Sequence, residues 1–536
     1  MVDSRRGHGR PPSVRHCKLR WTCRKGPLAV FSMYHFHDET NSVTKNATAF
    51  SLALPPRHSK TPAYRWLYSA LRSEILDGRL RSGAKIPATR DLARQYRLSR
   101  GTIVSAFELL KSEGYLRGTI GSGTYVSKIL PDALLQVTRA PGPESSPHRR
   151  KKPSVSDYGR RVGLFPSYEI RPSRAFRANV PALDLFPTTL WAQLTARRLR
   201  RASRLLLLGC DPMGYGPLRD AVANYLSTSR GVKCGPEQIA IVSGVQEALD
   251  LTARLLLNPG DRVCMENPGF IGARMAFKAF GSKVCAVDLD DEGMKLRGQN
   301  LRDVRLVYVT PGHQFPLGIT MSLPRRLELL EWARKSGALI FEDDYDSEYR
   351  YSGPPVPALQ GFDRHGSVIF AGSFSKVLFP SLRLGYLVIP PDLVPFFAAA
   401  ISLTTRHAPL PEQAVVCDFI TEGHFGRHLR RMREVYAERL SVLLESAREK
   451  LSGLLEISEI EAGLQTVGWL REGLDDESAT RAAAAHGVEV FPLSWYTRGK
   501  GAREGLQLGF AAVDAREIRR GVQDLATALE TESRGC

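Results

Sequence analysis

The sequence lacks paired cysteines and long hydrophobic runs. Its eight cysteines are scattered without a CxxC pair, which argues against a disulfide framework and against a metal site. No apolar run approaches the ~18 residues that a membrane span needs, and no apolar signal core follows the arginine pair near the N-terminus. We therefore expect a cytoplasmic protein with neither a metal nor a membrane partner.

Acidic residues are scarce in the first part of the chain. Residues 1–165 carry 30 Lys or Arg and 11 Asp or Glu, which accounts for +19 of the formal net charge of +20. The other 371 residues are therefore close to neutral. This asymmetry predicts that the front of the chain meets a polyanion and that the rear has a different task.

Local patterns divide the 536 residues into four parts. Residues 1–60 lack periodicity and are expected to form a basic, disordered extension. Residues 61–128 show three short helical patterns and a hairpin pattern, and residues 129–175 have the composition of a basic linker. Residues 176–536 alternate strand-like and helical stretches, which predicts an α/β domain with a mostly parallel central sheet.

The pattern of residues 61–128 is typical of a winged helix-turn-helix. Apolar spacing predicts one helix ending at Gly78, a second around residues 87–97 and a third from residue 100 to Gly114. A hairpin with a Gly-Ser-Gly turn follows. The third helix of such a domain can lie in the major groove of DNA. The alternative is an ordinary three-helix element with a solvated charged face.

Residues 86–126 carry the DNA-binding prediction. They read "IPATRDLARQYRLSRGTIVSAFELLKSEGYLRGTIGSGTYV" and resemble the GntR family of winged-helix regulators. The resemblance implies double-stranded operator DNA as a partner. The candidate contacts are Arg90, Ser99, Arg100, Thr102, Gly121 and Ser122. Gly101 and Val104 stand where that family often has further polar contacts, so sequence specificity is expected to rest on fewer side chains.

One lysine in the rear of the chain has unusual neighbours. Lys376 lies in "AGSFSKVLFPSLRLGY" and is either a surface residue or a desolvated amine that can form a Schiff base. Ser373, Ser375 and Arg383 supply two hydroxyls and a guanidinium within the same segment. These groups are suited to a phosphate monoester, which favours the interpretation of Lys376 as a desolvated amine that can form a Schiff base.

Two further segments supply what a phosphorylated cofactor needs. In "VSGVQEALDLTARLL", the first helical amides, at Val245 and Gln246, would form an anion site. In "FEDDYDSEYRY", Asp343 and Tyr345 follow a strand, although clustered acids also occur in metal sites and solvated loops. A phosphate anchor, an acid, a phenol and a lysine together suit pyridoxal phosphate.

Residues from about 184 to 530 resemble fold-type I aminotransferases. The motifs are "PMGYGPLRDAVANYL", "ENPGF", "VTPGHQFPLG", "EDDYDSEYR" and "SFSKVLFPSLRLGY". The resemblance implies pyridoxal 5'-phosphate as cofactor, with Lys376 as its Schiff-base lysine and Asp343 beside its pyridine nitrogen. It also implies contacts from Tyr345 to the ring O3′, from Phe270 to the ring face, from Ser373 and Arg383 to the phosphate, and from His313 or Gln314 near O3′.

A GntR-like head joined to an aminotransferase-like body resembles the MocR/GabR subfamily of regulators. That resemblance implies a domain-swapped homodimer and a small amine or amino-acid effector that acts at the cofactor and alters operator binding. The alternative is a genuine aminotransferase with an accessory DNA-binding head. We expect a transcriptional regulator rather than a physiological enzyme, because a complete winged helix has little purpose in a metabolic enzyme. A third alternative is a scaffold protein that no longer binds the cofactor. It would require that the lysine or the phosphate-binding residues be missing, and both are present in the sequence.

Three positions depart from the aminotransferase pattern. Gln507 stands where these enzymes usually place an arginine for the substrate carboxylate, and Gly272 stands where one regulator type has a second arginine. Val245 lacks the hydroxyl that many relatives have in the phosphate turn. Arg406 and Arg498 are considered as substitutes for the missing arginine, with a surface position as the alternative for each.

Overall fold

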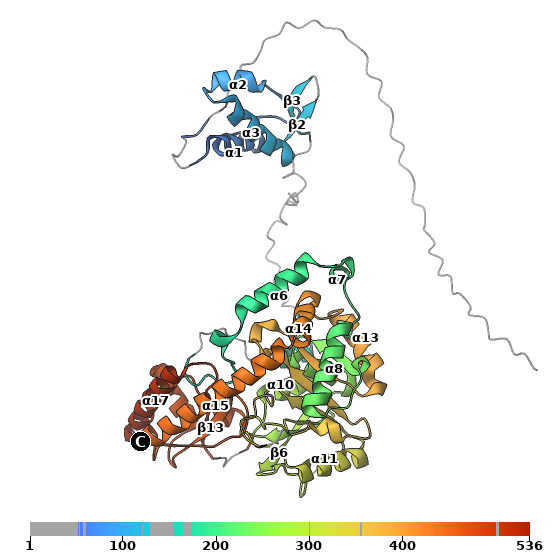
Figure 1. Ribbon diagram of the computed structural model, residues 1–536, viewed down its shortest axis with the longest axis vertical. Coiled ribbons are helices and arrows are strands. Elements are labelled where there is room, and N and C mark those ends of the chain that lie inside the picture. The colour runs from blue at the N-terminus through green and yellow to red at the C-terminus, as the bar shows by residue number, and fades with distance from the viewer. Residues whose placement is uncertain are drawn as a thin grey trace, which may run out of the picture. The chain divides into compact units, whose positions relative to one another are not determined.

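The computed structural model describes residues 52, 54–56, 61–119, 122–128, 154–163, 165, 174–299, 301–353, 356–499 and 503–535. The chain divides into two compact units, Met1–Arg150 and Lys151–Cys536, which we call the head and the body. Figure 1 shows the head as a few helices with a hairpin and the body as a larger α/β unit. Within the described ranges, no helix is both long and apolar enough to cross a membrane.

The head consists of three helices and a three-stranded sheet. Its elements are α1 (Ala63–Leu76), β1 (Lys85–Ile86), α2 (Thr89–Gln95), α3 (Arg100–Ser112), β2 (Leu116–Thr119) and β3 (Gly123–Val126). The strands are antiparallel in the order β1-β3-β2. Leu67, Leu71 and Ile75 lie on one face of α1 and are buried in the core, as their helical spacing predicts. The predicted winged helix-turn-helix is confirmed.

Two features of the head differ from expectation. Strand β1 has only two residues, so no alternation in the sequence could indicate it, and its pairing with β3 alone defines it. Leu52 is buried in the core of the head, and its N–H donates a hydrogen bond to Tyr96 Oη (2.7 Å). The Pro55 carbonyl accepts one from Trp66 Nε1 (2.9 Å). The end of the expected extension therefore belongs to the head.

An eight-stranded sheet forms the centre of the body. Its order is β4 (Ile239–Val242), β11 (Gly385–Val388), β10 (Val368–Ser373), β9 (Leu339–Asp344), β8 (Val304–Val309), β5 (Arg262–Asn267), β6 (Lys283–Asp290) and β7 (Gly293–Met294). Strands β11 and β7 are antiparallel to their neighbours, whereas the other strands share one direction. The predicted mostly parallel sheet is confirmed, and its parallel strands end at one edge.

Helices cover both faces of this sheet. One face packs against α9 (Val245–Leu256), α10 (Ile271–Phe280) and α13 (Val394–Thr404). The other packs against α8 (Gly216–Arg230), α11 (Leu323–Ser336) and α14 (Leu410–Thr421). The strand residues alternate accordingly, because Ala240 of β4 faces the first layer and Ile241 the second.

A smaller antiparallel sheet lies in the C-terminal part of the body. Its order is β12 (Leu455–Ile457), β13 (Gln465–Leu470), β15 (Gly505–Gly509) and β14 (Phe491–Pro492). The flanking helices are α15 (His424–Lys450), α16 (Asp476–Ala485) and α17 (Ala515–Gly535). Leu506 and Leu508 face the helices, whereas Val467 on the opposite face packs with Phe315 and Tyr345.

Short helices complete the body, and one of them lies in the range expected to be a linker. They are α5 (Asp157–Val162), α6 (Thr188–Arg200), α7 (Arg204–Leu208) and α12 (Phe374–Val377). Ser156 caps α5 by accepting from the Gly159 N–H (3.1 Å). Arg161 Nε donates to the Ala279 carbonyl (2.8 Å), which fastens α5 to α10.

Candidate functional site

The body gathers its candidate cofactor residues at one edge of the large sheet. Val245 follows β4, Phe270 follows β5, Asp343 lies at the end of β9, and Lys376 lies on α12 directly after β10. These strands are parallel, so their carboxyl ends meet at the same edge. Arg383 reaches that edge as well, because it precedes the antiparallel strand β11. Residues 138 positions apart in sequence are thereby brought to one place.

Lys376 has the environment of a reactive amine. Its Nζ is partly buried and donates a hydrogen bond to the Asn179 carbonyl (2.9 Å). Burial lowers the pKa of Lys376 to about 8, and the nearby carboxylates of Asp346 and Asp343 oppose that shift only in part. An amine with this pKa is uncharged in an appreciable fraction near neutral pH, which is the form that attacks a carbonyl.

Asp343 is a buried carboxyl with one unused oxygen. Tyr308 Oη donates to Asp343 Oδ2 (2.6 Å), whereas Oδ1 is buried and has no hydrogen-bond partner among the described residues. Burial raises the pKa of Asp343 to about 7, although the bond from Tyr308 opposes this shift. A cationic N–H placed against Oδ1 would satisfy that oxygen and favour the carboxylate.

Tyr345, His313 and Asp346 form a buried chain beside Asp343. Tyr345 Oη lies 3.0 Å from His313 Nδ1, and Asp346 Oδ1 lies 2.9 Å from the same nitrogen. His313 Nε2 is buried without a partner among the described residues. Burial raises the pKa of Tyr345 well above its ordinary value. Its hydroxyl therefore stays protonated and can donate to a ligand oxygen.

Arg383, Ser373 and the turn before α9 are the candidate residues for holding an anion. A Cβ at Gly244 would lie 3.7 Å from both terminal nitrogens of the Arg383 guanidinium. Gly244 has φ 120° and ψ 174°, a conformation that only glycine adopts readily. Ser373 Oγ accepts from the Ser375 N–H (3.2 Å), and Ser375 Oγ is buried without a partner among the described residues. The start of α9 at Val245 adds its free N–H groups.

His313 and Gln314 are not equivalent, although both were candidates for contact with O3′. Gln314 Nε2 donates to the carbonyls of Pro268 (2.9 Å) and Phe315 (2.6 Å), and its Oε1 accepts from a backbone N–H of its own loop. Its amide is thus used to hold the loop. Phe270 packs edge-on against Phe315 with 5.4 Å between ring centroids. His313 is therefore the better candidate for a ligand contact.

Gly272 has no room for a side chain in this arrangement. A Cβ there would lie 2.5 Å from Phe270 Cζ and 2.9 Å from Gln246 Oε1. The Gln246 side chain itself donates to the Gly272 carbonyl (3.3 Å). Gln246 therefore fixes the start of α10, and an arginine at position 272 would displace the ring of Phe270.

The two arginines considered as substitutes for the missing carboxylate ligand do not join the site. Arg498 Nη1 donates to the Val284 carbonyl (2.7 Å). Arg406 is exposed after the end of α13. The surface alternative therefore describes both arginines, and Arg498, which is also exposed, supports the edge of β6.

Four residues of the site were missed by the sequence analysis. They are Asn179, Tyr308, Asp346 and Tyr496, which contact Lys376, Asp343, His313 and Gln507 respectively. Asp346 had a signal, since it stands within the acidic run that contains Asp343. Asn179 and Tyr308 come from segments distant in sequence from their partners, Tyr496 precedes Gln507 by 11 residues, and no local pattern marks these three.

In the head, three of the candidate DNA contacts lie together at the start of α3. Ser99 Oγ accepts from the Thr102 N–H (3.1 Å) and lies 2.8 Å from Thr102 Oγ1, which is the geometry of an N-cap. Arg100 is exposed beside them, and Val104 is exposed one turn later. Arg90 on α2 is also exposed. The helix therefore presents both hydroxyls and a guanidinium at its N-terminal end.

The hairpin of the head carries a second polar group. Ser122 Oγ lies 2.7 Å from Tyr125 Oη, and Lys85 Nζ lies over the Tyr125 ring at 5.7 Å from its centroid. Lys85 was not among the predicted contacts. Gly121 lies outside the described residues, so its expected contact with DNA stays a prediction.

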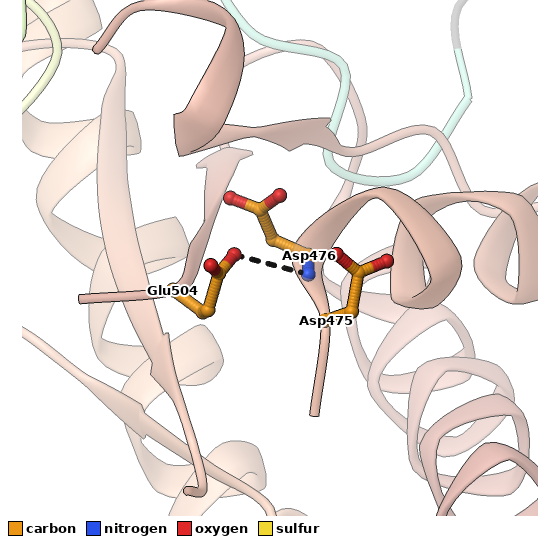
Figure 2. A group of neighbouring side chains, drawn as sticks. All are labelled: Asp475, Asp476 and Glu504. Atoms are coloured by element: carbon orange, nitrogen blue, oxygen red, sulfur yellow. Dashed lines mark hydrogen bonds between the residues drawn. The ribbon is translucent and has the colours of Figure 1, made fainter. Parts of the chain in front are cut away.

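An acidic group in the C-terminal part has a structural explanation. Figure 2 shows Asp475, Asp476 and Glu504 together, with Glu504 accepting from the Asp476 N–H (3.3 Å). Asp475 caps α16 by accepting from the Ser478 N–H (2.6 Å). Asp476 accepts from the N–H (2.9 Å) and Oγ (2.7 Å) of Ser494. These carboxylates hold a helix start and a turn, which accounts for them without a metal ion.

Two family models match the chain. Residues 63–126 match the family described as bacterial regulatory proteins, gntR family. Residues 176–525 match aminotransferase class I and II. The first range spans the described helices and strands of the head, and the second contains the large and small sheets of the body.

Known proteins similar to this chain fall into two groups. The probable rhizopine catabolism regulatory protein MocR of Rhizobium meliloti is 40% identical over 89% of this chain and 96% of its own. Aromatic-amino-acid aminotransferase 1 of Thermococcus litoralis is 30% identical over 66% of this chain and 87% of its own. The crystal structure of a multiple substrate aminotransferase from Thermococcus profundus has a TM-score of 0.64 at 30% identity, and covers 71% of this chain and 98% of that one.

Proposed function

This chain belongs to the MocR type of GntR-family regulators, which join a DNA-binding head to an aminotransferase class I and II body, and we propose from this that pyridoxal phosphate and an amine effector control its binding to operator DNA. The observation that carries the proposal is a set of buried atoms around Lys376 that lack partners among the described residues. They are Asp343 Oδ1, His313 Nε2 and Ser375 Oγ.

These atoms fit the cofactor. Asp343 Oδ1 would accept from the pyridine N–H, Tyr345 and His313 would hold the ring hydroxyl, and Ser373, Ser375 and Arg383 would hold the phosphate. Phe270 would cover one face of the ring. When bound, the cofactor supplies an aldehyde that exchanges between amines and a ring that withdraws electrons from the attached carbon.

The residues of the chain prepare that chemistry. Lys376 would hold the aldehyde carbon, since burial lowers its pKa to about 8 and keeps part of the amine uncharged. Asp343 would keep the ring nitrogen protonated by pairing with it, and Tyr345 would donate to the ring oxygen because burial raises its pKa. The small sheet packs against this edge through Val467 and would limit the entry of water.

Binding of an amine must favour one arrangement of the protein to alter DNA affinity. We propose that the regulator acts as a homodimer, since two heads would read two half-sites of an operator. Arg90, Ser99, Arg100, Thr102, Gly121 and Ser122 would contact the DNA. The Ser99 and Thr102 hydroxyls and the α3 amides would meet phosphate, and Arg100 would reach base edges.

A genuine aminotransferase with an accessory head is the second candidate. The intact set of Lys376, Asp343 and Tyr345 supports it. The extent of the similarity supports the regulator, because MocR matches 89% of this chain whereas the T. litoralis aminotransferase matches 66%.

The test is the full-length protein loaded with pyridoxal phosphate and given alanine with 2-oxoglutarate. The regulator predicts at most one equivalent of pyruvate per bound cofactor, together with specific binding to the DNA upstream of its own gene. Sustained production of pyruvate without specific DNA binding would contradict the proposal.

A further inference from the structure

The effector side of the site is closed by one face of the small sheet. Val467 of β13 pairs with Gln507 of β15, so their side chains share a face. Val467 packs with Phe315 and Tyr345, which places this face against the cofactor edge of the large sheet. Gln465 stands two residues before Val467 and therefore points the same way.

Aromatic residues pack together around this face. Phe315 lies 5.4 Å from Phe270, 5.9 Å from Tyr345 and 5.2 Å from Tyr496 between ring centroids. Tyr496 Oη in turn donates to Gln507 Oε1 (2.8 Å). The glutamine thus joins the same group of rings that surrounds Tyr345.

The polar side chains on this face are neutral amides, and most of their polar atoms make no hydrogen bond among the described residues. Gln507 is fully buried, and its Nε2 has no hydrogen-bond partner among the described residues. Gln465 is 1% exposed and its side chain interacts with Tyr345, but neither its Nε2 nor its Oε1 makes a well-formed hydrogen bond among the described residues. A buried amide without partners is unfavourable, so these two side chains favour a ligand that supplies donors and acceptors.

No charged residue stands on this face of β13 and β15. Besides the two glutamines, it carries Val467, Trp469 and the glycines at 505 and 509. Position 272 leaves no space for a cation either, because a Cβ there would lie 2.5 Å from the ring of Phe270. Glu266, Asp343 and Asp346 are buried close by, on the large-sheet side. The two strands therefore offer a ligand carboxylate no counter-ion, and in the proposed function the cations Lys376 and Arg383 are committed to the aldehyde and the phosphate. The buried carboxyls would in addition repel such a ligand.

We infer that the effector is an amine whose other polar groups are neutral hydroxyls or amides, not a carboxylate. Gln465 and Gln507 would bind those groups, Gln507 through Nε2 and Gln465 through both amide atoms. A hydroxyl donates and accepts one bond each, which matches what the two amides leave unsatisfied. This inference rests on the proposed function, since it assumes that the amine is recognised at the Lys376 site.

A matched pair of probes tests the inference. Serinol (2-amino-1,3-propanediol) and serine differ only in that serinol has a hydroxymethyl group where serine has a carboxylate. Each is titrated into the cofactor-loaded protein while the absorbance of the bound aldehyde and the thermal midpoint are measured. We expect the half-saturating concentration of serinol to be at least roughly tenfold lower, since an unpaired buried charge costs more than 1.4 kcal/mol.

The variant Gln507→Arg sharpens the test. A guanidinium at this position supplies the missing counter-ion, so the preference is expected to reverse in favour of serine. Gln523→Arg, at an exposed position of α17, is the matched control and leaves the preference unchanged. Gln507→Leu is used if the arginine variant fails to fold. It should weaken the binding of serinol and leave the binding of serine unaffected.

The possible results distinguish a wrong effector class from a wrong proposed function. Equal or tighter binding of serine to the native protein overturns the inference while leaving an amine-responsive regulator intact. An unchanged preference in a folded Gln507→Arg protein also overturns it. If neither amine alters the absorbance or the thermal midpoint, the proposed function itself fails and the inference falls with it.

Discussion

The head and the body hold their candidate sites in opposite ways. In the head, Arg90, Ser99, Arg100 and Ser122 are exposed, and a small core only positions them. In the body, Asp343 and Tyr345 are buried, and burial shifts the pKa of both groups upwards. One site presents its polar groups to water, and the other keeps them out of water.

The difference indicates two modes of recognition in one chain. Exposed cations attract a polyanion over a distance and are screened by salt, so the head should bind weakly to any DNA and lose affinity as salt rises. Buried groups without partners interact strongly with a ligand that completes them, and such a site should be selective and little affected by salt. Substitutions in the head should therefore change the affinity and salt dependence of DNA binding, whereas substitutions in the body should change the binding of the cofactor and the effector.

The largest expected effect is in the body. Lys376→Ala should abolish the covalent absorbance of bound pyridoxal phosphate, because no other amine occupies the position after β10. The matched control is Lys335→Ala on the exposed surface of α11, which should retain the native spectrum. A native-like spectrum in Lys376→Ala would show that the cofactor lysine has been assigned wrongly.

The next effect is in the head. Arg100→Ala should weaken operator binding by about 1–3 kcal/mol, or roughly 5- to 150-fold in Kd, and should reduce the salt dependence, because one exposed cation is lost. Binding is measured by fluorescence anisotropy at several salt concentrations. Arg65→Ala, exposed on α1, serves as control. Unchanged affinity and salt slope in Arg100→Ala would contradict the placement of α3 on DNA.

A third prediction concerns pH and the buried carboxyl. Burial raises the pKa of Asp343 from 3.8 to about 7, so the folded state binds the proton more tightly than the unfolded state. The free energy of unfolding of the cofactor-free protein should therefore fall as pH rises from about 4 to 7.

Asp343→Asn should remove part of that dependence, up to about 1.4 kcal/mol per pH unit for one proton. Urea unfolding at several pH values measures the slope. Asp291→Asn, an exposed position, should leave it unchanged. An identical slope in Asp343→Asn would mean that this carboxyl titrates normally.

The smallest effect tests local structure in the head. Ser99 caps α3 through the Thr102 N–H, so Ser99→Ala should destabilise the start of that helix by about 1 kcal/mol. Hydrogen exchange of the α3 amides in the full-length protein detects this change, and Ser105→Ala within the helix is the control. Equal protection in both variants would contradict the role of the cap.

Sequence patterns predicted the parts of the fold that depend on local order. Helical spacing located α1 and α3, and the alternation of strand-like and helical stretches indicated the large parallel sheet of the body. The lysine, the acid and the phenol were expected from motifs at the ends of strands, where parallel sheets place ligands.

What the patterns missed depends on long-range folding. Strand β1 is too short to show a period, and Leu52 joins the head only through Tyr96. Gln507 was noticed as a departure, but its unpaired Nε2 and its bond from Tyr496 follow from how the small sheet packs on the cofactor edge. No spacing in the sequence encodes that packing.

One measurement tests the central claim most directly. The cofactor-loaded protein is mixed with fluorescent operator DNA, and absorbance and anisotropy are followed together as the amine that perturbs the absorbance at the lowest concentration is added. The account predicts that both signals change with the same midpoint and that Lys376→Ala loses both responses. A parallel sample also contains 2-oxoglutarate as amino acceptor. An absorbance change with sustained formation of glutamate there and unaltered DNA binding would contradict effector control, and would identify an aminotransferase whose head is idle.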